Sequence, residues 1–220
     1  MKVIKLSAII LTVALFLFAC SKDNAVNIEN NVLASDDSLE EYERINLHGN
    51  YVEYDEEDSL YKEAELIVLA HTNKDFLDRE HIITMTPADG DLPETIEDFY
   101  TKTPIIITEV IKSPEGSNIK ANDEIEIIEP ISILEEEKKI LLMENYTAIN
   151  KDDKYIIYLQ DNSFGEYSII NLNNGRFNLE SDEQIVNLHE HGHDNDKEKH
   201  AKFKKQVKEK FKVELKKYNF

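Results

Sequence analysis

Short apolar runs separated by polar turns fill the chain from residue 65 to about residue 180. The runs recur at spacings of about ten residues, and no long helical pattern lies between them. They are residues 66–70, 80–86, 103–111, 124–127, 139–143, 155–159, 167–170 and 176–179. Such a series favours an antiparallel barrel or sandwich over an α/β fold. The sequence therefore predicts a mainly β domain over residues 59–182.

Two local signals refine this prediction. Asp58-Ser59 is typical of a helix N-cap and predicts a short helix that leads into the first strand. Asn173-Asn174-Gly175 is typical of a hairpin turn and predicts that the strand after it pairs with the strand before it.

The N-terminus differs in kind from the rest of the chain. Lys2 and Lys5 accompany an apolar run over residues 6–19, which is too short for a membrane span and suits a signal peptide. The run ends in Leu17-Phe18-Ala19-Cys20, which resembles a bacterial lipobox, where a signal peptidase cuts before a lipid-modified cysteine. The resemblance implies that residues 1–19 are a signal peptide and that Cys20 carries acyl chains. Acyl chains hold a protein at a membrane, so we expect it on the outer face of the cytoplasmic membrane of a Gram-positive bacterium.

Residues 20–58 are polar, acidic and without a periodic apolar pattern. This composition predicts a flexible, lipid-anchored tether between membrane and barrel. Cys20 is the only cysteine, which excludes an intramolecular disulfide framework and a CxxC-type zinc or redox site.

Charge is unevenly distributed. The chain has 45 Asp plus Glu against 25 Lys plus Arg, a net charge of −20, which argues against nucleic acid as a partner. Three dense acidic clusters, residues 55–58, 135–137 and 152–153, are predicted to be solvated surface.

The C-terminal residues 197–220 show a different pattern. Phe203, Val207, Phe211, Leu215 and Tyr218 recur at helical spacing, and lysines fill the other faces. We predict a basic amphipathic helix with two alternative roles. Its aromatic stripe either docks on the acidic barrel or lies on an anionic membrane or wall polymer.

A His/Asp-rich linker, residues 183–196, precedes this helix. His189, His191 and His193 alternate, so an extended chain puts them on one face, and Asp194 and His200 follow. Imidazole and carboxylate ligands suit Zn²⁺, Cu²⁺ or Ni²⁺. The spacing is not that of a catalytic HExxH site. The alternative interpretation is a solvated linker with incidental histidines and no cofactor.

Two segments carry a further likeness. Residues 61–70 lead a short helix into a strand, and residues 150–159 put a polar turn ahead of an aromatic–aliphatic strand. Over residues 58–180 the chain resembles an uncharacterised group of secreted and lipid-anchored Gram-positive proteins. More distantly it resembles netrin-like and metalloproteinase-inhibitor domains, which implies that the barrel is OB-like. The cysteines of those domains are absent, so their inhibitory mechanism is not carried over to any residue.

No catalytic motif stands out. The sequence has no Gly-x-Ser-x-Gly elbow, and its six glycines form no phosphate-binding loop. We therefore expect a membrane-anchored, extracytoplasmic, non-enzymatic module that binds a ligand or protein. The alternative is divalent-metal capture through the His-rich segment.

Overall fold

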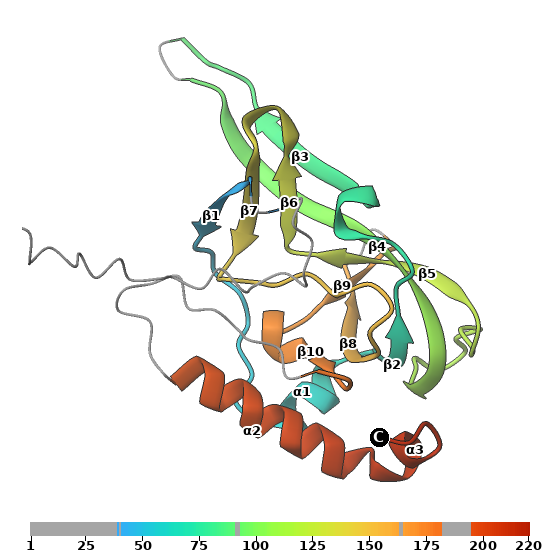
Figure 1. Cartoon of the computed structure of the whole chain (residues 1–220). Coiled ribbons are helices and arrows are strands. Elements are labelled where there is room, and N and C mark those ends of the chain that lie inside the picture. The colour runs from blue at the N-terminus through green and yellow to red at the C-terminus, as the bar shows by residue number, and fades with distance from the viewer. Residues whose placement is uncertain (1–38, 40, 91–92, 163–164, 182–194) are drawn as a thin grey trace, which may run out of the picture. The chain divides into compact units, whose positions relative to one another are not determined.

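The computed structural model describes residues 39, 41–90, 93–162, 165–181 and 195–220 (Figure 1). The strands are β1 (Glu43–Leu47), β2 (Leu66–His71), β3 (Glu80–Thr86), β4 (Thr95–Lys112), β5 (Glu124–Glu129), β6 (Ile131–Leu134), β7 (Lys139–Met143), β8 (Tyr155–Asp161), β9 (Tyr167–Ile169) and β10 (Arg176–Asn178). The helices are α1 (Glu57–Glu63), α2 (Asn195–Lys210) and α3 (Lys212–Lys216), with the 3₁₀ segments η2 (Phe76–Asp78), η3 (Glu135–Glu137) and η4 (Leu172–Gly175). The prediction of a mainly β fold with a short first helix and a C-terminal helix is confirmed.

Five of these strands close a barrel in the order β8-β2-β4-β5-β9, with β9 pairing back to β8. In sequence order the barrel strands are β2, β4, β5, β8 and β9. β2 pairs with β4 and β4 with β5, then β5 pairs with β9 and β8 pairs with β2. This is OB-like connectivity. The pairing is mixed rather than wholly antiparallel, because β5 and β9 run parallel. A parallel pair needs a long connection, and the chain between β5 and β9 supplies one.

A second, three-stranded sheet has the order β1-β7-β6. In it β1 runs parallel to β7, with Glu43 opposite Lys139 and Leu47 opposite Met143. Residues 43–47 thus differ from the flexible tether that we predicted for residues 20–58. A strand of five residues is too short to show a clear period in the sequence, and the partner that orders it is far along the chain.

Two hydrophobic cores share the strands β2 and β8. Leu66 and Val68 of β2 face the barrel interior, whereas Ile67 and Leu69 face a second cluster under α1 and the C-terminal helices. The alternation continues in β8, where the even-numbered Ile156 joins the second cluster. Both faces of these strands are covered, so their sequences read as continuous apolar runs.

The C-terminal helices dock on the barrel. The second cluster buries Phe203, Val207, Phe211 and Leu215. Of the two roles predicted for this helix, the structure therefore shows the first, docking of its apolar stripe on the barrel. Ion pairs form across the same contact. Lys199 pairs with Glu53 and Asp55, Lys202 with Glu56, and Lys210 with Glu57 and Asp58. The acidic cluster 55–58 is therefore paired with the helix rather than only solvated.

The hairpin predicted at Asn173-Asn174-Gly175 is wrong. These residues lie in η4, and β10 pairs with β8 instead of β9. Asn171 and Leu172 ahead of them have positive φ, at 60° and 51°. Position 175 has to be glycine because the Ile170 backbone lies very close to it: a Cβ at position 175 would lie 1.6 Å from the Ile170 carbonyl oxygen. Tertiary packing thus overrides the local turn preference.

Mutation can test the contact between the C-terminal helices and the barrel. Phe211→Ala should lower the free energy of unfolding by about 3–5 kcal/mol, because it leaves a cavity beneath the helix. Val213→Ala is the matched control, since Val213 is 75% exposed and its loss should cost less than about 0.5 kcal/mol. Urea denaturation measures both values. Equal small losses would contradict the docked arrangement.

Candidate functional site

Most of the predicted site residues lie outside the described residues, namely Cys20, His189, His191, His193 and Asp194. His200 is described and is 6% exposed. Its ring stacks on Phe177 with centroids 5.2 Å apart, and its Nδ1 lies 3.2 Å from Asn174 Oδ1. His200 therefore takes part in the contact between helix and barrel.

The metal prediction stays a prediction. In the part of the chain that the structure describes, no group of three or more His, Cys, Asp or Glu side chains is placed to hold a metal ion. None of the described helices combines the length and apolarity needed to cross a bilayer.

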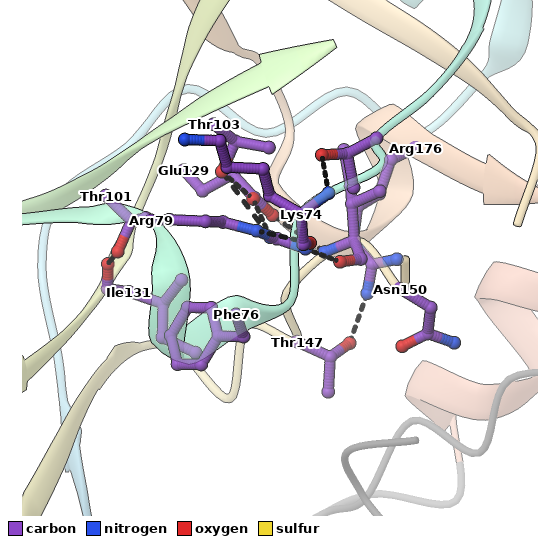
Figure 2. A network of polar contacts seen from close by, with 12 residues as sticks. Lys74, Phe76, Arg79, Thr101, Thr103, Glu129, Ile131, Thr147, Asn150 and Arg176 are labelled. Carbon is purple, nitrogen blue, oxygen red and sulfur yellow. Dashed lines mark hydrogen bonds and ion pairs between the residues drawn. The ribbon is translucent and has the colours of Figure 1, made fainter. Parts of the chain in front are cut away.

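A buried ion pair lies inside the barrel, and Figure 2 shows its two side chains pointing toward one another. Arg79 Nη1 donates to Glu129 Oε1 over 2.8 Å, and both side chains are almost fully buried. The Arg79 Nη2 donates to the Ile149 carbonyl over 2.6 Å and to the Lys74 carbonyl over 3.1 Å. Its guanidinium also lies over the Phe76 ring.

Each carboxylate oxygen of Glu129 accepts two hydrogen bonds. Oε1 accepts from Arg79 and from the Thr103 hydroxyl, while Oε2 accepts from the Tyr146 hydroxyl and the Ile149 amide, both over 2.8 Å. A carboxylate offers about four lone-pair sites, and each of those of Glu129 accepts from a donor of the fold. The network is therefore a structural one.

A second buried cation, Arg176, lies beside this network. Its guanidinium packs over the rings of Tyr146 and Tyr155, at 5.2 and 5.5 Å. It donates to the Thr147 hydroxyl and to Asn173 Oδ1. These contacts fix the loop that follows β7 against β10.

An open pocket of about 320 Å³ lies between α1 and α2 and is lined by Glu56, Glu57, Asp58, Gln206, Glu209 and Lys210. Lys210 lies 2.5 Å from Glu57 and 2.8 Å from Asp58, and Tyr158 donates to Glu57 over 2.8 Å. Burial, together with the charge of Glu57, raises the pKa of Tyr158 far above its ordinary value. Tyr158 stays a neutral donor, and the single charge of Lys210 is shared by two of the pocket's carboxylates, Glu57 and Asp58.

The outer end of the β3–β4 hairpin is an exposed feature formed by two paired strands. Residues 83–86 and 95–99, here called the distal ribbon, pair with each other, whereas β5 pairs with β4 only from Thr101 onward. Figure 1 shows this end of the hairpin extending past the barrel strands. The root of the hairpin is held by β6, where Thr101 donates to the Ile131 carbonyl and Ser132 donates to the Ile82 carbonyl.

A β-bulge determines which side chains the distal ribbon presents. Thr84 lies opposite Asp98, but Met85 lies opposite Ile96, so Glu97 is the extra residue. Ile83 and Met85 share one face, because side chains alternate along a strand. Phe99 and Ile96 lie opposite them on that face.

This face passes from buried to exposed along the ribbon. Phe99 is 8% exposed, whereas Met85 is 37% and Ile96 is 36% exposed. Sequence reasoning expected the strand at 80–86 but missed its partner segment 95–102 and therefore this pair. We take Met85 and Ile96, with the carboxylates around them, as the candidate functional site.

Comparison with family models, with curated proteins and with solved structures identified no match for this chain. The fold defines a class, an OB-like β barrel with a docked C-terminal helix.

Mutation can also test the buried network around Glu129. Glu129→Gln should lower the free energy of unfolding by about 3–5 kcal/mol, because Arg79 is left buried without its counter-charge. Glu124→Gln on the same strand is the control, since Glu124 is exposed and should change stability by less than about 0.5 kcal/mol. Chemical denaturation measures both, and a loss below about 1 kcal/mol for Glu129→Gln would contradict a structural role.

Proposed function

We propose that this protein is a lipid-anchored, extracytoplasmic, non-enzymatic module that binds another protein through the distal ribbon. The observation that carries the proposal is the exposed pair Met85 and Ile96 on a face whose root is buried. Contiguous apolar surface with a polar rim is typical of protein–protein contact sites, and here Met85 and Ile96 are direct neighbours across the ribbon.

The buried polar groups support the non-enzymatic part of the proposal. Glu129 has all its acceptor sites occupied by donors from the fold, and Glu57 is held by Tyr158 and Lys210. General acid–base catalysis needs a titratable group that can reach a substrate proton. The Glu129 oxygens face only donors of the fold, and each Glu57 oxygen is already engaged by Tyr158 or Lys210.

The sequence supports the anchoring part. The only cysteine of the chain follows Leu17-Phe18-Ala19, at the end of the apolar run and ahead of a polar segment. Acyl chains on Cys20 would hold the barrel at the membrane surface.

Site-specific crosslinking tests the binding function. A photoreactive benzoyl-phenylalanine placed at position 85 or 96 of the full-length chain should give discrete adducts with another polypeptide in the producing cells. The same group at position 213, which is more exposed, should not. Identical adducts at all three positions, or none at any of them, would contradict binding through the ribbon.

The anchor is tested by Cys20→Ala. The variant should appear unprocessed or in the medium, whereas the wild-type protein should fractionate with membranes and take up labelled fatty acid. Ala19→Ser, which keeps a small residue before the cysteine, is the control and should be processed normally. Lipid labelling of the Cys20→Ala protein would refute the assignment.

A further inference from the structure

We infer that the partner of the distal ribbon is a polypeptide segment with apolar side chains between Lys or Arg residues. The inference rests on the proposed protein-binding function and adds the chemistry of the partner. It depends on the charge around Met85 and Ile96, on the bulge, and on the unpaired edges of the ribbon.

The hairpin is acidic beyond its root. Between Arg79 and Lys102 the sequence contains no Lys or Arg. Glu94 and Glu97 are exposed beside the apolar pair, Asp98 is exposed on the other face of the ribbon, and Asp89 is exposed in the connection between its strands. None of these four carboxylates forms an ion pair with any described residue. This differs from the acidic residues of segment 53–58, whose five carboxylates all pair with one of three lysines of α2. The ribbon thus keeps a negative field that attracts a basic partner and speeds its encounter.

The bulge makes the apolar centre of this surface. In a regular pairing Glu97 would stand opposite Met85, and the face would carry a carboxylate at that position. With the extra residue, Ile96 lies opposite Met85 and extends the face of Phe99 and Ile83. The result is an apolar pair with carboxylates beside it, the arrangement of a contact centre and its polar rim.

The backbone also favours a polypeptide over a small ligand. Within the described chain, the distal ribbon has β-pairing only between its own two strands, so both outer edges remain open to a further strand. A second copy of the same ribbon is a poor occupant, because like charges would face each other across the contact. An added basic strand would pair with the edge while its apolar side chains cover Met85 and Ile96.

Peptide binding to the full-length chain tests the inference. The probes are three labelled 12-residue peptides: alternating Lys and Val, alternating Lys and Ser, and alternating Glu and Val. Fluorescence anisotropy at two salt concentrations gives the dissociation constants. We expect the Lys/Val peptide to bind at least about tenfold more tightly than the Lys/Ser peptide, and the Glu/Val peptide not to bind.

Two double variants separate the two parts of the surface. Met85→Thr with Ile96→Thr should weaken Lys/Val binding about tenfold and leave Lys/Ser binding unchanged. Ile96→Thr alone should weaken Lys/Val binding by a smaller factor. Glu94→Gln with Glu97→Gln should weaken binding of both basic peptides and reduce its salt dependence. The matched controls, Val213→Thr and Glu124→Gln with Glu126→Gln, should behave as wild type.

Several outcomes would overturn the inference. These are equal binding by the Thr double variant and wild type, equal losses in the controls, or no binding of any basic peptide. Self-association that the Thr double variant abolishes would show that a second copy is the occupant. The crosslinking test does not use these peptides, so the binding function and the partner chemistry fail separately.

Discussion

The carboxylate of Glu129 is the contact on which the rest of the structure depends. It ends β5, and its four donors come from β4, from the segment before β3, and from the loop between β7 and β8. A buried charge is tolerated only when its partners are complete. The pair with Arg79 therefore fixes the point at which β3 begins and β4 leaves the barrel. The direction of the distal ribbon follows from that point.

The fold distributes charge unevenly over the surface, which the net charge of −20 does not show. The lysines on one flank of α2 meet the acidic residues before and within α1, where apolar burial of Phe203 and Phe211 already holds the helix. Exposed ion pairs contribute little free energy by themselves. They add to the contact between the helix and the barrel, whereas Glu94 and Glu97 of the hairpin have no ion-pair partner among the described residues.

The sequence predicted the elements better than their partners. The continuous apolar run of β2 identified a buried strand because both of its faces are covered, with Leu66 inward and Ile67 outward. Glu129 left a weaker signal: Glu124 and Glu126 alternate with isoleucines, and Glu129 falls on the isoleucine phase, where a carboxylate must be buried. Its partner Arg79 was not predictable, since Arg79 lies just before β3 and is 50 residues from Glu129 in sequence. The role of Gly175 was missed for the same reason, because a close backbone approach leaves no local pattern.

The distal ribbon was least predictable, because a shift of one residue decides which side chains share a face. A two-stranded ribbon is marginal by itself, and open edges invite unwanted pairing. Carboxylates along the strands counter that pairing between copies. The same carboxylates would repel an acidic partner and admit a basic one. Glu97 lies at the bulge beside Ile96 instead of opposite Met85. The backbone thus brings two apolar side chains together on a surface that Glu94 and Glu97 make acidic, and the proposed binding function rests on that arrangement.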